Sequence, residues 1–390
     1  MLIAVFLAAA WLAYSNGAND NMKGVATLLG SGTSGYRGAL SWGTAMTLAG
    51  SLSALLLAGR LLEAFSGRGI VSAAATGNPA FLVAVGLGAA AAVSVATLRG
   101  LPVSTTHALV GGLAGAGIAL AGPGAVLWPA LGRSFLVPLL LSPLLAAGLV
   151  SLVYPLLHRA RLRMGVEEDT CLCVGAEPAI VLPPRAGAGG VGPLADGVPA
   201  AAMAGVSATP LAEAVTVSTA IGVSEECASR YGGRLLGIDA QRILDGLHYL
   251  SAGAVSFARG LNDTPKIAAL LLAGSVVHGH QAAMAIIGAG MATGALLHAR
   301  RTGETLSFEI TPMNSGQGFT ANLTTAALVI GASRLGVPVS TTHVSVGALF
   351  GLGASSRRLV RSTLRRILFA WLVTLPAGLA LAWLVGLLIG

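Results

Sequence analysis

Charged side chains are scarce in this chain of 390 residues, because Asp, Glu, Lys and Arg together make up only 10% of it. A soluble domain carries about 25% charged residues, so the composition excludes an ordinary soluble globular protein. Three cysteines are too few for a disulfide-held scaffold, and Cys171 and Cys173 are too closely spaced for a usual zinc pair. At 5% aromatic residues, no basic-aromatic surface for nucleic acid accompanies the net charge of +8.

Lysine is almost absent: Lys23 and Lys266 are the only two among 23 Lys and Arg residues. They end two copies of one repeat, Gly-Ala-Asn-Asp-Asn-Met-Lys at 17–23 and Gly-Leu-Asn-Asp-Thr-Pro-Lys at 260–266. Each lysine lies four residues after an Asn and three after an Asp, inside an apolar stretch. An ammonium and a carboxylate placed twice in hydrocarbon indicate a site that handles ions.

Apolar sequence, in contrast, is abundant, at 54% hydrophobic residues with a mean hydropathy of +0.79. Runs of about 20 apolar residues, the length that spans a bilayer, recur along the chain. We therefore expect an all-α integral membrane protein that keeps its N-terminal helix. The predicted spans are 2–30, 38–59, 80–98, 102–121 and 135–157, then 243–277, 281–298, 313–333, 338–354 and 367–389.

A second repeat, Pro-Val-Ser-Thr-Thr-His, occurs unchanged at 102–107 and 338–343. The first motif recurs at an offset of 243 residues and the second at 236, in the same order. The chain is therefore two halves of about five spans each. Because an odd number of spans reverses the orientation of the second copy, the pattern predicts inverted repeats, with broken or re-entrant helices at the motifs.

The two halves define the domain organisation. We expect a first membrane repeat over 1–157, a linker over 158–240 and a second repeat over 241–390. Within the linker, the Gly, Pro and Ala content predicts poor order over 183–210, and a helix is expected over 211–229. The basic clusters 159–163, 300–301 and 357–366 fall on one side of this topology. The positive-inside rule makes that side cytoplasmic, with the N-terminus outside a plasma membrane.

The Gly-x-Asn-Asp motif lies near the middle of a span in each half. We expect a local break of the helix there, lining a cavity and exposing N–H groups to an anion. Asn and Asp oxygens suit a small cation or accept from a protonated oxyanion. The alternative is an Asp–Lys pair that only locks helices together. The pooled charge of Asp20, Asp263, Lys23 and Lys266 is expected to be near zero.

The Pro-Val-Ser-Thr-Thr-His motif combines a helix start with three hydroxyl groups. Proline permits the helix N-terminus, and the hydroxyls can donate to a tetrahedral oxyanion without adding charge. The alternative is N-capping and packing between helices. His107 and His343 either bond a neighbouring carbonyl or gate or carry a proton.

At these motifs the chain resembles the inorganic phosphate transporter (PiT) family, whose signature is a duplicated G-A-N-D-x-x-N with a duplicated P-[VI]-S-T-T-H. The resemblance implies a secondary transporter, not an enzyme, with no resident cofactor, in the lipid bilayer as a homodimer. Phosphate would lie between the hydroxyls of Ser104, Thr105, Thr106, Ser340, Thr341 and Thr342. Sodium or protons would supply the coupling, with Asn19, Asp20, Asn262 and Asp263 as ligands if sodium is used.

The departure from the family lies at the lysines, which replace its second Asn in both motifs. Leu261 and Pro265 also depart from the pattern. Our hypothesis is that Lys23 and Lys266 bind substrate as built-in cations and that transport is sodium-independent, either proton-linked or uncoupled. Sulfate, a dianion of equal size, remains an alternative substrate, and a passive anion channel an alternative mechanism. An intramembrane hydrolase is disfavoured, because Ser104 and His107 share one helical turn and duplication of a triad has no catalytic purpose.

Overall fold

The structure is a computed structural model, and it describes residues 1–390 except 68, 73–75, 77, 167–169, 179–214 and 224–234. The described chain divides into two compact units. One combines Met1–Ala160 with Leu244–Gly390, and the other is Arg161–Ile243.

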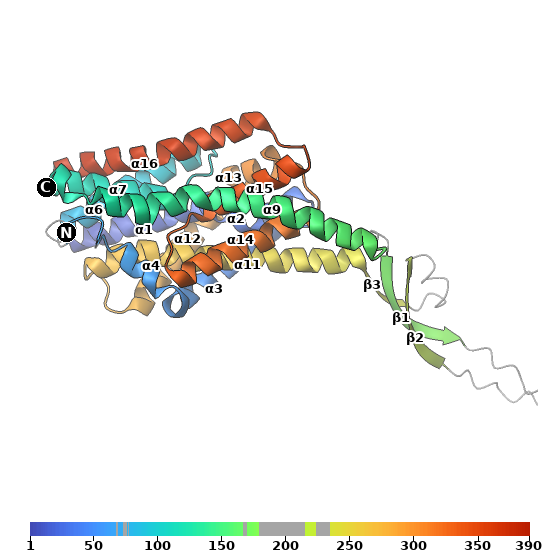
Figure 1. Cartoon of the computed structure of the whole chain (residues 1–390). Coiled ribbons are helices and arrows are strands. Elements are labelled where there is room, and N and C mark those ends of the chain that lie inside the picture. The colour runs from blue at the N-terminus through green and yellow to red at the C-terminus, as the bar shows by residue number, and fades with distance from the viewer. Residues whose placement is uncertain (68, 73–75, 77, 167–169, 179–214, 224–234) are drawn as a thin grey trace, which may run out of the picture. The chain divides into compact units, whose positions relative to one another are not determined.

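The first unit is helical (Figure 1). Its first half contains α1 (Leu2–Asp20), α2 (Met22–Gly30), α3 (Tyr36–Leu57), α4 (Gly59–Ala64), α6 (Pro79–Leu98), α7 (Thr105–Ala121), η1 (Pro123–Ala125), α8 (Trp128–Leu131), η2 (Gly132–Leu136) and α9 (Val137–Arg163). Its second half contains α11 (Ala240–Ala273), α12 (His280–His298), α13 (Arg300–Glu304), η3 (Thr305–Glu309), α14 (Ser315–Leu335), α15 (Thr341–Ser355) and α16 (Arg361–Ile389). A helix occupies each of the ten predicted spans, and six helical segments among the described residues are long and apolar enough to cross a membrane. The predicted all-α, multi-pass membrane class is confirmed.

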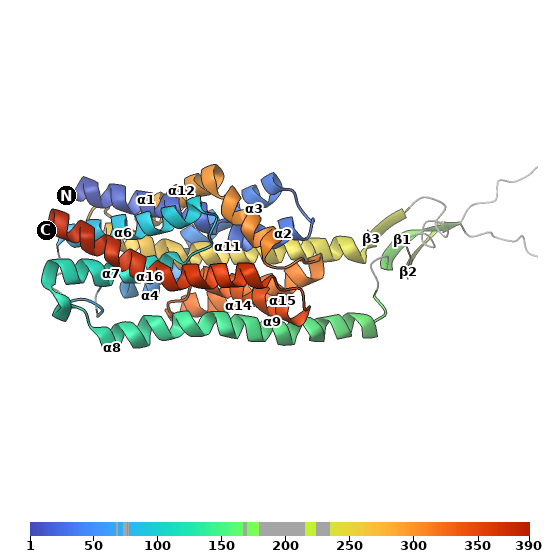
Figure 2. The same ribbon diagram turned by 90° about the horizontal axis from the view of Figure 1, so that it is seen from above.

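Two helical hairpins carry the Ser-Thr-Thr motifs at their tips. Helix α6 packs on α7, and α14 packs on α15. The first hairpin lies toward the end of the unit that holds both termini, and the second toward the other end (Figures 1 and 2). The tips meet, because the His107 and His343 rings are 4.4 Å apart. Because its two arms are antiparallel, each hairpin returns the chain to the side of the membrane from which it entered. The number of membrane crossings in each half therefore stays odd, and the two halves remain inverted relative to each other.

Repeated sequence builds repeated helix starts in these hairpins. Asn78 Oδ1 accepts from the N–H of Ala80 at 2.9 Å, and Asn314 Oδ1 accepts from the N–H of Gln317 at 2.9 Å. The two asparagines are 236 residues apart, the offset of the second motif. Each therefore caps the first arm of its hairpin, which satisfies an N–H that the helix leaves unpaired.

The expected break at the Gly-x-Asn-Asp motif is only a one-residue interruption in the first copy, between α1 and α2, and the second copy has no break. Asn21, between α1 and α2, keeps helical angles of φ −60° and ψ −40°. Helix α11 runs unbroken through Gly260 and even Pro265. The motif's polar side chains find partners without opening the backbone. The chain breaks instead just before α7 and α15, where Pro102 and Pro338 carry no N–H to continue a helix.

Glycine allows the motif helices to approach their neighbours closely. A Cβ on Gly17 would lie 1.8 Å from the carbonyl oxygen of Met291, and one on Gly260 would lie 2.1 Å from that of Thr47. Small residues permit this packing in membrane proteins. The first glycine of each motif therefore fixes α1 against α12 and α11 against α3.

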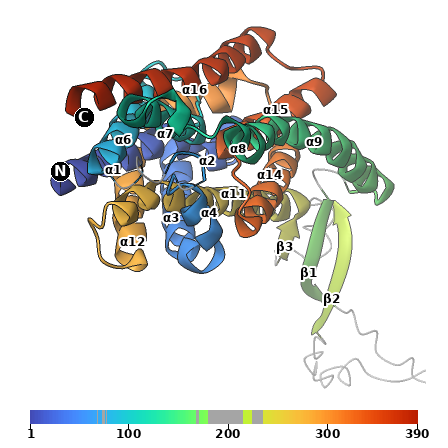
Figure 3. The same ribbon diagram turned by 60° about the vertical axis from the view of Figure 1, so that its left-hand side comes forward.

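The second unit contains a three-stranded antiparallel sheet in the order β2-β1-β3 (Figure 3). Its strands are β1 (Thr170–Pro178), β2 (Val215–Val223) and β3 (Leu235–Asp239). The helix predicted over 211–229 is therefore wrong for 215–223. That segment alternates Val, Thr and Ile with smaller residues, and β-branched side chains favour strands. The segment predicted to be poorly ordered, 183–210, lies outside the described residues.

Candidate functional site

All four motifs contribute to one buried polar cluster in the first unit, where α1, α2 and α11 meet the two hairpin tips. Each of the twelve predicted site residues is at most 4% exposed. They are Asn19, Asp20, Lys23, Ser104, Thr105, Thr106, Asn262, Asp263, Lys266, Ser340, Thr341 and Thr342. The cluster therefore joins residues up to about 320 positions apart in the chain.

The ammonium of Lys23 lies in a cage made only of oxygen atoms. It donates to Asn19 Oδ1 at 3.2 Å and to the carbonyl oxygen of Val103 at 2.8 Å. It also donates to the Asp20 carboxylate and to the hydroxyl of Thr342. An ammonium has three N–H donors, so four oxygen neighbours satisfy it fully.

Lys266, in the second half, has an equivalent set of contacts that includes a threonine of the first half. Its ammonium donates to the Thr106 hydroxyl and to the Val339 carbonyl, both at 2.8 Å, and to Asp263 Oδ1 at 3.4 Å. It also lies 5.5 Å from the centre of the Phe65 ring, a cation–π contact. Each lysine thus contacts a threonine of the opposite hairpin, so the two ammonium groups join the halves.

The two aspartates share Asn16 as a partner. Asn16 Nδ2 is 3.1 Å from Asp20 Oδ2 and 3.4 Å from Asp263 Oδ2. The same nitrogen lies 3.0 Å from the hydroxyl of Thr105. The two carboxylates therefore belong to one site and not to separate sites in the two halves.

The six motif hydroxyls divide into three equivalent pairs. Ser104 and Ser340 accept from the N–H of His107 and His343, at 3.1 and 3.2 Å, so both serines are helix N-caps. Thr105 and Thr341 donate to Asp20 and Asp263 at 3.4 and 3.3 Å. Thr106 and Thr342 accept from the lysines. N-capping thus accounts for the serines, and the threonines join the charged cluster.

The cluster contains a third cation that the sequence analysis did not identify. Arg259 is 1% exposed and stands 243 residues after Asn16, at its repeat-equivalent position. Its guanidinium donates to Asn16 Oδ1 at 3.3 Å and to Asn21 Oδ1 at 3.0 Å. The signal that could have revealed it is a lone arginine in an apolar stretch, directly before the second copy of the Gly-x-Asn-Asp motif.

Arg259 changes the charge of the site. Three cations, Lys23, Lys266 and Arg259, face two carboxylates, so the formal sum is +1 rather than the expected zero. Electrostatic interactions are strong where water is excluded. The net positive charge of the cluster therefore favours binding of an anion. Its two carboxylates can accept a hydrogen bond from an anion that carries a proton.

His107 and His343 lie where the hairpin tips meet. Their rings pack edge to face, and His343 packs in the same way on Trp371 at 3.8 Å. Among the described residues, neither Nδ1 atom has a hydrogen-bond partner. Because repeat-equivalent residues touch here, the approximate two-fold axis of the repeats passes between the two rings. The structure therefore shows no hydrogen bond from Nδ1 of His107 or His343 to a neighbouring carbonyl of the described chain.

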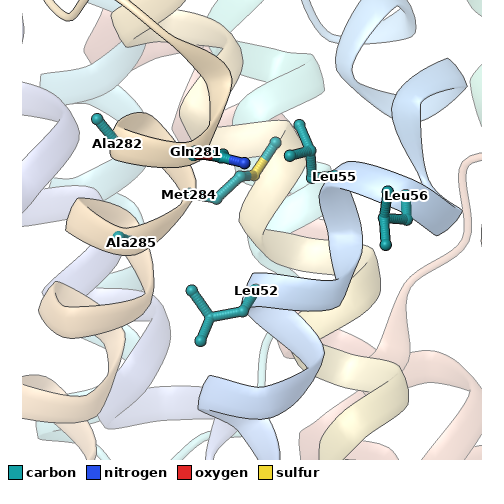
Figure 4. A pocket seen from close by; sticks show the side chains of 7 residues that line it. All are labelled: Leu52, Leu55, Leu56, Gln281, Ala282, Met284 and Ala285. Carbon is teal, nitrogen blue, oxygen red and sulfur yellow. The ribbon is translucent and has the colours of Figure 1, made fainter.

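A cavity of about 540 Å³ lies elsewhere in the first unit, between α3 and α12. Figure 4 shows Leu52, Leu55 and Leu56 on one side of it and Gln281 and Met284 on the other. Its lining is mainly apolar and includes none of the twelve predicted residues. The cavity is therefore separate from the charged cluster.

Comparison with known proteins gives the family of this sequence. The profile described as "Phosphate transporter family" matches residues 16–382. A protein of Pyrococcus horikoshii, provisionally named a phosphate permease, is 28% identical over 94% of this chain and 92% of its own. Inorganic phosphate transporter 2-1, chloroplastic, of Arabidopsis thaliana is 29% identical over 97% of this chain and 70% of its own.

A solved structure has the same fold. It is titled "The sodium-dependent phosphate transporter" and superposes with a TM-score of 0.71, covering 100% of this chain and 98% of its own. Its sequence is 19% identical, so the similarity establishes the architecture and not the ligands.

Proposed function

The chain belongs to the phosphate transporter family, and from this premise we propose that its phosphate site is the buried cluster and that its lysines stand in for coupling sodium ions. The protein is a membrane permease for inorganic phosphate. The oxyanion would lie between the hairpin tips, held by the hydroxyls of Thr106 and Thr342 and by the ammonium groups of Lys23 and Lys266.

The observation that carries this proposal is the oxygen cage around Lys23. A carboxylate, an amide carbonyl, a backbone carbonyl and a hydroxyl surround the ammonium. Hard cations such as sodium take oxygen ligands of these same kinds. A covalently attached cation in such a cage meets the need for positive charge permanently. A bound sodium ion is then superfluous, and movement of phosphate becomes proton-linked or uncoupled.

The acceptors in the cluster support phosphate over sulfate. Phosphate carries at least one O–H group at neutral pH, whereas sulfate carries none. Asp20 and Asp263 can accept from that group, but against sulfate they would face a ligand with no proton to donate. The carboxylates and sulfate would therefore repel each other as like charges, with no hydrogen bond between them to offset the repulsion. The formal charge of +1 offsets one negative charge of the substrate.

The orientation and assembly follow the charge pattern and the family resemblance. We place the N-terminus outside the plasma membrane and the linker in the cytoplasm, because the basic clusters 159–163, 300–301 and 357–366 then fall inside. A homodimer is expected from the resemblance alone.

Uptake of radiolabelled phosphate into proteoliposomes tests the proposal. We expect equal initial rates when sodium is replaced by potassium or choline on both sides, and little competition from excess sulfate. A rate that collapses without sodium contradicts the role of the lysines. Strong competition by sulfate contradicts the role of the carboxylate acceptors. Omitting a pH gradient in a parallel series separates proton-linked from uncoupled movement.

A further inference from the structure

A second buried polar cluster lies between α2, α11 and α14, and we refer to Thr27, His248 and Asn322 there as the seam. The Thr27 hydroxyl lies 3.0 Å from His248 Nε2 and accepts from Asn322 Nδ2 at 2.8 Å. All three residues are at most 3% exposed. Thr27 is four residues after Lys23 in the same helix, so both side chains lie on one face. The seam therefore begins one turn from the proposed phosphate site.

Polar contacts continue from the seam toward the loop before α3. The Thr33 hydroxyl lies 3.3 Å from His248 Nδ1 and 3.0 Å from Ser315 Oγ. Thr33 is partly buried in the loop between α2 and α3, and Ser315, the first residue of α14, is 8% exposed. Hydrogen bonds thus link Thr27, one helical turn from Lys23, through His248 to Thr33 and Ser315.

The other half of the molecule provides an internal comparison. The repeat-equivalents of Thr27, His248 and Asn322 are Leu270, Val5 and Gly86. Leu270 is 2% exposed and Val5 is 0% exposed, and both lie in the largest hydrophobic cluster of the described residues. The same places in the fold are thus equally buried but apolar, so the architecture itself does not require polar groups there.

Space for the histidine is provided by a glycine. A Cβ on Gly318 would lie 2.4 Å from His248 Nε2. The repeat-equivalent of Gly318 is Leu82, which is buried in the hydrophobic cluster of the first half. The second half thus exchanges a large apolar side chain for an imidazole that faces the seam.

Burying polar groups costs free energy unless they are hydrogen-bonded, and in a membrane the gain from such bonds is small. An ionisable residue inside a membrane protein, here His248, is a marker of ion and substrate pathways. Extending the proposed function, we propose that phosphate passes between the central site and the end of the first unit where α11 begins, through the seam, with Thr27, His248 and Asn322 donating to it in turn. In this conformation the apolar equivalents close the opposite end, which opens in turn for phosphate to cross the membrane. The bonds within the seam hold it shut, and a passing oxyanion replaces them.

Cysteine labelling tests this route against a purely structural polar contact. The native Cys171, Cys173 and Cys227 are first replaced by serine, and phosphate uptake by this parent is measured. Thr27→Cys and Asn322→Cys then probe the seam, with Leu270→Cys and Val5→Cys as matched controls. The probe is an anionic, membrane-impermeant methanethiosulfonate, applied to vesicles of each orientation.

We expect the seam cysteines to react from the side that carries 158–240, about tenfold faster than the controls, since thiol reactivity requires access. Phosphate should slow the labelling of both seam cysteines. Equal rates at seam and control positions, or rates that phosphate leaves unchanged, overturn the proposed route. Ser315→Cys, at the mouth, provides a further probe if a deeper variant fails to fold. A sodium requirement in the parent contradicts only the lysine proposal, because the labelling pattern does not depend on it.

Discussion

Replacing Lys23 by methionine removes the ammonium and keeps an unbranched stem of similar length. Asp20 would then lose a buried partner, because the Lys23 and Asp20 side chains are each 1% exposed. Removing one member of a buried ion pair costs about 3–5 kcal/mol. At about 1.4 kcal/mol per factor of ten, phosphate affinity should fall by about two to three and a half orders of magnitude if the cost is expressed in binding.

The assay is phosphate binding by calorimetry on purified protein, with thermal unfolding measured in parallel. The matched control is Arg300→Gln, which breaks an ion pair with Glu304 at 2.8 Å. That pair is exposed, with relative side-chain accessibilities of 76% and 48%, so no measurable change in affinity or unfolding temperature is expected. Wild-type affinity and stability in Lys23→Met would refute the reasoning.

Asparagine at both lysine positions tests whether a bound sodium ion can take the place of each ammonium group. The double variant Lys23→Asn with Lys266→Asn restores the residue that the PiT signature carries there. We expect it to regain activity as sodium is added, whereas the corresponding methionine variants should not respond. Indifference of the asparagine variant to sodium would refute the idea that each ammonium replaces a bound ion.

The remaining predictions concern Arg259 and the motif glycine. Arg259→Gln lowers the formal charge of the site from +1 to zero, so the phosphate dissociation constant should rise about tenfold or more, whereas Arg259→Lys should recover part of the affinity, as titration calorimetry can measure. Gly260→Ala places a Cβ 2.1 Å from the Thr47 carbonyl oxygen and should lower the unfolding temperature by several degrees. Gly246→Ala, in the same helix with open space around it, should leave that temperature unchanged or raise it, and an equal loss in both variants would contradict the packing argument.

Duplication made much of the site predictable from the sequence. Two motifs repeated at fixed offsets identify the same chemistry twice, and inverted halves bring the copies together. The pairing of each lysine with a threonine of the opposite hairpin could not be predicted, because spacing along one helix does not reveal which side chain faces it. Arg259 was missed because its repeat-equivalent, Asn16, differs from it in type.

Local backbone was harder to predict than the convergence of the motifs. Asn19 and Asp20 are unfavourable in a helix interior, yet here their side chains are held by Lys23, Thr97 and Asn16, so the helix continues. The strand β2 was mistaken for a helix because the Gly, Pro and Ala content around it hid its β-branched pattern. Side-chain hydrogen bonds decided the first outcome, and a local β-branched pattern decided the second.

In the proposed function, Lys23 and Lys266 replace coupling sodium. In the most direct measurement, labelled phosphate and radioactive sodium are added to the same side of proteoliposomes. Their movement to the other side is then followed together as the phosphate gradient runs down. We predict phosphate movement with no accumulation of sodium above that in protein-free vesicles. Sodium that accumulates in a fixed ratio to phosphate would contradict it.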